Sequence, residues 1–284
     1  MVTKSIQEIQ EKAAAYRQEG KRIAVVPTMG YLHDGHRALI REAKNRADIV
    51  ITTVFVNPAQ FGPGEDFERY PRDLDRDIRI AKEAGTEIVF APDTEAMYPP
   101  QFSSFVLVEK LTSVLEGKFR PGHFRGVATV VAKLFHLTQP HVAVFGQKDA
   151  QQVIVIQRMI RDLNFGIDLV VIPTVREKDG LALSSRNTYL TPNQRGEAPV
   201  LCKALNEVQK KISLGFTSGK ELVKGMNEMI TSQSSGVIDY ISIADAETLE
   251  ELTTLNGHRK ILASLAVRFG KTRLIDNILI ERKD

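Results

Sequence analysis

The residues with the clearest chemical potential lie in one short run near the start of the chain. An apolar segment ends at Pro27 and is followed by Thr-Met-Gly-Tyr-Leu-His-Asp-Gly-His, which places His33 and His36 three residues apart ahead of a helical segment. Gly30 and Gly35 allow the backbone to approach a ligand closely. A helix amino terminus favours anions, because it presents backbone N–H groups and a partial positive charge. With two imidazoles as further donors, the run predicts a phosphate-binding loop that stabilises charge growing at phosphorus.

Two other roles for the histidine pair stay open on the residues alone. The imidazoles could cap the helix, which is the expected role for an arbitrary His-x-x-His spacing. A zinc site would need further cysteine, histidine or carboxylate ligands, and the chain has one cysteine and no other histidine near this run. The order of strand, glycine loop and helix favours the phosphate-binding interpretation over both.

Amide side chains follow the second apolar segment. Asn57 and Gln60 lie just past its end, where the carboxyl ends of parallel strands gather ligands. Their carboxamides can both donate to and accept from a small hydroxy acid. An Asn-Pro pair is also common in plain turns, so a turn without a ligand is the alternative.

Cationic and hydroxyl side chains follow later segments. Lys148 comes directly after an apolar run and precedes a helix, so its ammonium could approach nucleotide phosphates as a mobile point charge. Ser184, Ser185 and Arg186 offer two hydroxyls and a guanidinium fork that suit β- and γ-phosphates. The alternatives are a solvated lysine and an ordinary linker between domains.

The elements that must position these residues alternate along the first part of the chain. Apolar, β-rich runs are predicted as strands and the amphipathic segments between them as helices. The predicted strands are 23–26, 49–56, 88–90, 142–145 and 169–172, and the predicted helices are 37–47, 74–84, 124–137 and 150–163, after a first helix that begins behind Ser5 and ends near Gly20. Continuously apolar strands indicate a parallel sheet covered on both faces. Residues 1–176 are therefore predicted as a doubly wound, Rossmann-like α/β domain.

A different pattern begins near residue 177. Thr191, Pro192 and Gln194 predict the start of a long helix, and Ser218 with Glu221 predicts another. Three β-like segments follow at 237–243, 260–268 and 273–280. Residues 177–284 are therefore predicted as a smaller α+β domain with antiparallel strands.

Composition excludes several classes of protein. With 284 residues, 43% hydrophobic and 26% charged, the chain is a globular protein and neither disordered nor fibrous. A formal charge of +3 is too balanced to indicate a nucleic-acid or membrane partner. A single cysteine, Cys202, cannot form an internal disulfide, and no apolar run approaches the length of a membrane span. The polar start of the chain does not resemble a signal peptide, which predicts a cytoplasmic protein.

Several blocks together carry a resemblance to one family. The run 27–36 is similar to the His-x-Gly-His signature of the HIGH nucleotidyltransferase superfamily, in the form typical of the pantothenate synthetases, or pantoate–β-alanine ligases. The supporting blocks, in family order, are Phe-Val-Asn-Pro-Ala-Gln-Phe at 55–61, Tyr-Pro-Arg at 70–72, Arg-Pro-Gly-His-Phe-Arg-Gly-Val at 120–127, Phe-Gly-Gln-Lys-Asp-Ala-Gln-Gln at 145–152 and Asp-Gly-Leu-Ala-Leu-Ser-Ser-Arg-Asn at 179–187. The resemblance extends from about residue 20 to Asn277, with less specific blocks in the second domain.

The resemblance implies roles for particular residues. It places ATP against Met29, Gly30, His33, Gly35, His36, Gly146, Lys148, Asp149, Val175, Leu183, Ser184, Ser185 and Arg186, of which His33, His36, Lys148 and Arg186 are catalytic. It places pantoate and β-alanine against Met29, Asn57, Gln60, Arg120 and Gln152. It gives Mg²⁺ to Asp77, although an acidic helix start would look much the same. Arg120 and His123 lie near a predicted helix start and are expected to line the pantoate end of the cleft. His136, His141 and His258 have no supporting spacing and are expected to be structural.

The implied activity is a two-step ligation. Pantoate would react with ATP to give pantoyl adenylate and pyrophosphate, and β-alanine would then release pantothenate and AMP. The family is commonly dimeric, and its second domain is expected to act as a lid. The rivals are an adenylyltransferase of the same superfamily that stops after transferring AMP, and a nucleotide-binding regulatory module without catalysis.

Overall fold

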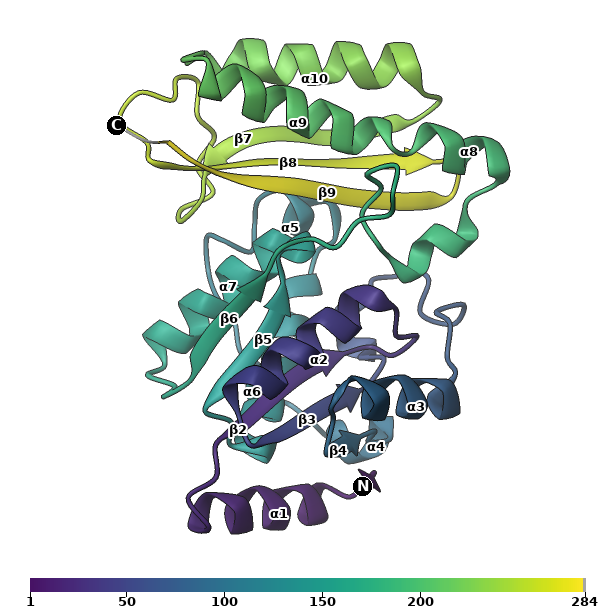
Figure 1. The fold of residues 1–284 in the computed structure, drawn as a ribbon, viewed down its shortest axis with the longest axis vertical. Coiled ribbons are helices and arrows are strands. Elements are labelled where there is room, and N and C mark those ends of the chain that lie inside the picture. Colours follow the sequence, from purple (N-terminus) through teal and green to yellow (C-terminus); the bar gives the residue numbers. More distant parts are fainter. Residues whose placement is uncertain (283–284) are drawn as a thin grey trace. The chain divides into compact units, whose positions relative to one another are not determined.

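The first half of the chain folds around a six-stranded sheet, drawn in purple to teal in Figure 1. Its strands are β1 (Val2–Thr3), β2 (Ile23–Thr28), β3 (Ile49–Val54), β4 (Ile88–Phe90), β5 (Val142–Gly146) and β6 (Asp168–Ile172). Their order is β1-β4-β3-β2-β5-β6, and every neighbouring pair is parallel. The predicted parallel α/β sheet is confirmed, and the two-residue β1 at its edge is an addition that the sequence pattern did not reveal.

The computed structural model describes residues 1–282, which form two compact units. The first unit contains Met1–Gln147 and Gln151–Pro173, and the second contains Lys148–Ala150 and the described residues from Thr174 onward. The functional boundary placed at residues 176 and 177 stays a prediction.

Helices cover both faces of the first sheet. They are α1 (Ile6–Gln18), α2 (Asp34–Arg46), α3 (Leu74–Ala84), α6 (His123–Thr138) and α7 (Ala150–Asp162), with the short helices η1 (Pro58–Gln60), α4 (Thr94–Met97) and α5 (Glu116–Phe119) between them. Helices α2 and α3 pack against each other and over the central strands, with Ala24 and Val26 of β2 turned toward Ile40 and Ala43 of α2. The alternate β2 residues lie on the other face, where α1 and α6 pack. Both faces of β2 are therefore buried, as its apolar sequence requires.

The strand order reverses beside β2. From β2 the chain proceeds through β3 to β4 on one side of the sheet and returns to β5 and β6 on the other side. Strands β2 and β5 pair directly, with Ala24 beside Val142. Ligands of doubly wound sheets bind at the carboxyl ends of the strands where the order reverses. These ends lead into the histidine loop after Thr28 and into the turn after Gly146.

The second unit is built on a three-stranded antiparallel sheet. Strands β7 (Val237–Asp245), β8 (Lys260–Phe269) and β9 (Thr272–Glu281) pair in that order, and helices α9 (Val200–Ser213) and α10 (Gly219–Gln233) pack on the sheet. Alternate residues of β8 enter one core with the helices; they are Ile261, Ala263, Leu265, Val267 and Phe269. The green and yellow part of Figure 1 shows both helices lying along the sheet. The predicted small α+β fold is confirmed.

Helix starts follow the capping residues, but several predicted boundaries of helices and strands need correction. Ser5, Thr191 and Ser218 each cap the predicted helix through a side-chain oxygen. The long helix expected behind Thr191 is wrong: α8 (Pro192–Glu197) has six residues, because Pro199 lacks the N–H that would continue the helix. Strand β3 ends at Val54, two residues before the predicted end, and α2 begins three residues before the predicted start.

Candidate active site

The two histidines of the loop between β2 and α2 cap helix α2. His33 is the N-cap residue, and its Nδ1 accepts a hydrogen bond from the Gly35 amide at 3.2 Å, while the His36 Nδ1 accepts from the His33 amide at 3.2 Å. The ring centroids are 4.1 Å apart. A nitrogen that accepts a hydrogen bond carries no proton, so in each neutral ring the proton is on Nε2. The capping role and a donor role therefore coexist in each ring.

Gly35 is required by this arrangement. A Cβ atom at Gly35 would lie 2.9 Å from two atoms of the His33 ring, because the imidazole folds back over the first turn of the helix. The expectation that the helix amino terminus leaves its amides for a ligand needs correction at this point, since the Gly35 amide already has a protein partner. The Gly35 amide is therefore used within the protein.

Asp77 holds the preceding part of the same loop. Its Oδ2 accepts from the Tyr31 amide and its Oδ1 accepts from the Leu32 amide, both at 2.7 Å, and the side chain is buried at 1% exposure. Burial raises the pKa of the Asp77 carboxyl, although the hydrogen bonds from the Leu32 and Tyr31 amides act to lower it. The Gly30 amide donates to Thr28 Oγ1 at 3.1 Å. This segment of the loop is therefore held by side chains of its own protein.

The magnesium ligand predicted at Asp77 does not fit this geometry. Both carboxylate oxygens are directed at backbone amides inside the protein, and the neighbouring Asp73 caps α3 by accepting from the Arg76 amide. Asp75 is exposed on the same helix. Among residues 1–282, no group of three or more His, Cys, Asp or Glu side chains is arranged as a metal-binding cluster.

The two amide side chains predicted to bind substrate, Asn57 and Gln60, belong to a buried cluster that follows β3 in the chain. Asn57 Nδ2 donates to Gln60 Oε1 at 3.0 Å and to the Gly126 carbonyl, while its Oδ1 accepts from the Ala59 amide and from the Tyr98 hydroxyl at 2.7 Å. A carboxamide has two donor and two acceptor positions, and all four are used. Asn57 is 1% exposed and orients Gln60, and the direct substrate contact predicted for Asn57 stays a prediction.

Gln60 is linked to the histidine loop from this cluster. Its Nε2 donates to the sulfur of Met29 at 3.1 Å, which connects the end of β3 with the end of β2. Helix α6 fits tightly against the same segment, because a Cβ at Gly126 would lie 2.1 Å from the Ala59 carbonyl oxygen. Burial raises the pKa of the Tyr98 hydroxyl, which keeps it a neutral donor to Asn57.

Arg120 and His123 hold the backbone of Gln60. Arg120 forms a bidentate ion pair with Glu65, with both N–O distances at 2.7 Å, and its Nη1 donates to His123 Nε2. His123 Nδ1 then donates to the Gln60 carbonyl at 2.8 Å. Burial, followed by the Arg120 charge, lowers the pKa of His123 to about 4, while the bonds to Arg120 lower the pKa of Glu65 against its desolvation. A contact of Arg120 with a substrate stays a prediction. The observed partners of Arg120 are Glu65 and His123, and His123 holds the backbone of Gln60.

The two glutamines at the start of α7 differ in burial. Gln151 is buried and anchors the 111–116 segment by donating to the Leu111 and Val114 carbonyls and accepting from the Glu116 amide. Gln152 is half-buried. The burial pattern leaves Gln152 as the candidate for a substrate contact in this pair.

In the second unit, a short hairpin brings together the predicted nucleotide residues. The Leu183 amide donates to the Val175 carbonyl at 3.0 Å, and Gly180 turns the chain with φ +96°. Ser184 caps the short helix η3 (Ser185–Tyr189) by accepting from the Arg186 amide. The hairpin therefore places Val175 beside the segment from Leu183 to Arg186. The Arg195 guanidinium holds the hairpin through Glu177 and Asp179.

The backbone of Lys148 is anchored within the second unit. It lies in the short helix η2 (Gln147–Asp149), and its carbonyl accepts from Asn277 Nδ2 at 2.8 Å. The preceding residue of β9, Asp276, forms a bidentate ion pair with Arg176 at 2.6 and 2.9 Å. The Lys148 ammonium lies 3.7 Å from the Asp149 carboxylate. Asn277 is thus a positioning contact that the sequence pattern did not single out.

Comparison with known proteins identifies the family. A sequence model described as Pantoate-beta-alanine ligase matches residues 1–279. The chain belongs to the pantoate-beta-alanine ligase family. It is 53% identical over 280 residues to a pantothenate synthetase of Moorella thermoacetica, covering 99% of this chain and 98% of that protein.

Solved structures of the pantoate-beta-alanine ligase family share the fold. The pantothenate synthetase of Thermus thermophilus superposes with a TM-score of 0.91 at 47% identity, covering 98% of each chain. The pantoate-beta-alanine ligase of Francisella tularensis, described as complexed with β,γ-ATP and β-alanine, has a TM-score of 0.75 at 32% identity and covers 98% of this chain and 97% of that one. The fold predicted for the family is therefore the fold of this chain.

The low pKa of His123 makes folding stability depend on pH. The folded state keeps this ring neutral down to about pH 4, whereas an unfolded histidine binds a proton below about pH 6.5. The contribution of His123 to stability is therefore complete well above pH 6.5 and is lost as the pH falls from there toward 4, by about 2 kcal/mol between pH 8 and pH 5. Urea unfolding at these two pH values checks this loss.

The variant His123→Asn isolates the contribution. An asparagine Nδ2 can replace the ring Nδ1 as donor to the Gln60 carbonyl but does not titrate in this range. The variant is expected to lose about 2 kcal/mol less than the parent protein between pH 8 and pH 5. Equal losses in the two proteins would contradict a neutral His123.

Proposed function

We propose that this chain catalyses the ATP-dependent condensation of pantoate with β-alanine, giving pantothenate, AMP and pyrophosphate. The observation that carries the proposal is the loop after β2, in which both imidazoles accept backbone hydrogen bonds at Nδ1 and so carry their protons on Nε2. Membership of the pantoate-beta-alanine ligase family over residues 1–279 supports it. So does the relative described with β,γ-ATP and β-alanine bound.

In the first step, a pantoate carboxylate oxygen attacks the α-phosphorus of ATP. A new P–O bond forms while the bond from the α-phosphorus to the bridging oxygen breaks, and pyrophosphate leaves. His33 and His36 donate from Nε2 to phosphate oxygens whose charge increases in the transition state, which is where preorganised donors accelerate a reaction. Lys148 and Arg186 add positive charge, and Ser184 and Ser185 add hydroxyl donors.

The sheet topology supports a role for Gly146 at the same nucleotide. Strands β2 and β5 are neighbours and parallel, so Gly146 at the end of β5 belongs to the same sheet edge as the histidine loop. The other ATP contacts of the proposal are made by Met29, Gly30, Gly35, Gly146, Asp149, Val175 and Leu183.

In the second step, the β-alanine amine attacks the carbonyl carbon of pantoyl adenylate. A C–N bond forms, the C–O bond to the phosphate breaks, AMP leaves, and the amine gives up a proton. Adenylation is needed because a free carboxylate is a poor acyl donor. Gln60 and Gln152 hold pantoate through its carboxylate and hydroxyls, beside Met29 and Arg120, and Asn57 keeps Gln60 oriented.

Magnesium enters the proposal only with the phosphates of ATP, where it would offset their charge. Asp77 is not proposed as its ligand, because both oxygens of that carboxylate accept backbone amides. The residues of this chain perform the steps above by binding, orienting and donating hydrogen bonds.

The proposal includes the setting in which the enzyme works. It acts as a homodimer in the cytoplasm, without a nucleic-acid partner, and its second unit acts as a lid over the adenylate. The balanced charge of +3 supports the absence of a nucleic-acid partner. No helix among residues 1–282 is both long and apolar enough to cross a membrane.

Isotope exchange between pyrophosphate and ATP tests the reaction. The purified protein is expected to incorporate labelled pyrophosphate into ATP only when pantoate and magnesium are present, and to form AMP and pantothenate when β-alanine is added. A stable dinucleotide product would support an adenylyltransferase instead. Nucleotide binding without exchange would support a regulatory module and would refute the ligase.

Replacement of one imidazole tests its role in the first step. His36→Ala removes an Nε2–H donor and is expected to slow pyrophosphate exchange about 10²–10³-fold, the usual cost of losing one transition-state donor. His136→Ala is the matched control, because His136 is exposed on α6. Exchange at the parental rate in His36→Ala would refute the assigned role.

A further inference from the structure

We propose that Asp77 is a positioning residue for the first step: its carboxylate fills an anion-binding nest in the histidine loop and so fixes the imidazoles in place. This inference rests on the proposed function only because its test measures pyrophosphate exchange. The contacts themselves lie entirely within the first unit.

The turn in this loop presents successive amides to one anion. Gly30 and Tyr31 have φ angles of +82° and +50°, and successive amides in a turn can form a concavity, called a nest, that binds anions. The amides of Tyr31 and Leu32 both meet the Asp77 carboxylate, one at each oxygen, at 2.7 Å. A phosphate often occupies such a nest, whereas here a side chain from α3, 45 residues further along, occupies it.

The fit around the carboxylate is tight. A Cβ at Gly30 would lie 2.8 Å from Asp77 Oδ2 and 3.0 Å from Val54 Cγ1. Tyr31 is not glycine, so its left-handed conformation at φ +50° is strained and persists only where surrounding contacts impose it. The Arg76 guanidinium lies over the Tyr31 ring, 5.0 Å from its centroid. Asp77 and its neighbour therefore hold both the backbone and the side chain at this turn.

The anchor is directly continuous with the imidazoles. Leu32, whose amide reaches Asp77, precedes the N-cap residue His33, whose amide in turn reaches His36 Nδ1. Hydrogen bonds from backbone N–H groups to an ionised carboxylate are stronger than those to a neutral acceptor. Loss of the charge at Asp77 would loosen the amides that lead into His33, and a displacement of about 1 Å at a reacting group can cost about 10²-fold in rate.

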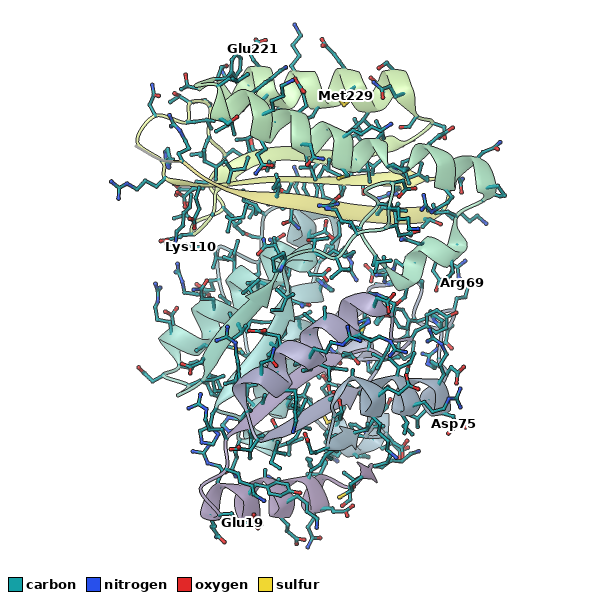
Figure 2. The ribbon with its side chains drawn as sticks, viewed as in Figure 1. Glu19, Arg69, Asp75, Lys110, Glu221 and Met229 are labelled. Carbon is teal, nitrogen blue, oxygen red and sulfur yellow. The ribbon has the colours of Figure 1, made fainter. Side chains whose placement is uncertain are left out.

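Asp77 acts through the loop and does not itself touch a substrate. The side chain is 1% exposed and both oxygens have protein partners. This assignment also explains the acidic residue at this position of α3 without a metal. The neighbouring Asp75 is exposed on the outer side of the same helix, where Figure 2 labels it.

The test compares Asp77→Asn with Asp75→Asn. An asparagine at 77 keeps the shape but presents an NH₂ group to one of the two amides, so kcat for pyrophosphate exchange is expected to fall about 10- to 100-fold. The KM for pantoate is expected to stay within about threefold, because Asn57 and His123 hold Gln60 without contact to Asp77, and circular dichroism should show a folded chain. Asp75→Asn is expected to match the parent protein in both constants.

Each outcome bears on the inference. A folded Asp77→Asn protein with parental kcat would overturn it, as would a rise in the pantoate KM equal to the fall in kcat. If Asp77→Asn does not fold, Asp77→Glu decides: this variant keeps the charge but moves the oxygens by one methylene, and parental kcat there would overturn the inference. Failure of the parent protein to exchange pyrophosphate would refute the proposed function, while the Tyr31 and Leu32 amide signals in NMR spectra would still report whether Asp77→Asn releases them.

Discussion

The histidine loop is fixed by the side chains that bind its backbone amides between β2 and α2. Five amides in this loop have side-chain partners: Gly30 bonds to Thr28, Tyr31 and Leu32 bond to Asp77, His33 bonds to His36, and Gly35 bonds to His33. A loop held in this way is formed before any ligand arrives, so binding energy need not be spent on ordering it. The same bonds fix which imidazole nitrogen carries the proton.

Gln60, which is proposed to bind pantoate, is likewise held in place by other side chains of the first unit. Gln60 is held at its carboxamide by Asn57 and at its carbonyl by His123, which is held in turn by Arg120 and Glu65. Residues that the family resemblance groups together therefore divide into two kinds. Some have every hydrogen-bonding position used inside the protein and serve as supports. Others, such as Gln152, are half-buried and suit contact with a substrate.

The helices and strands could be predicted well from the sequence, whereas the long-range hydrogen bonds that hold the site residues in place could not. Apolar runs and caps such as Ser218 are local signals, and they located the central strands and most helix starts. The support contacts join residues far apart in the chain: Asp77 reaches back 45 and 46 residues, and Arg120 reaches Glu65 across 55. An acidic residue in the first turn of a helix gives the same sequence pattern whether it interacts with the helix dipole, a metal or a distant loop. Only the fold distinguishes these roles.

The capping hydrogen bonds require both loop imidazoles to be neutral Nε2–H tautomers before substrate binds. Nitrogen-15 NMR of the folded protein with labelled histidine measures this directly, with His33→Asn and His36→Asn used for assignment. We expect Nδ1 of each ring to have the chemical shift of an unprotonated acceptor and Nε2 to carry the proton. The Nε2 signals should move when a non-hydrolysable ATP analogue is added. Protons on Nδ1 in the neutral rings would contradict this assignment.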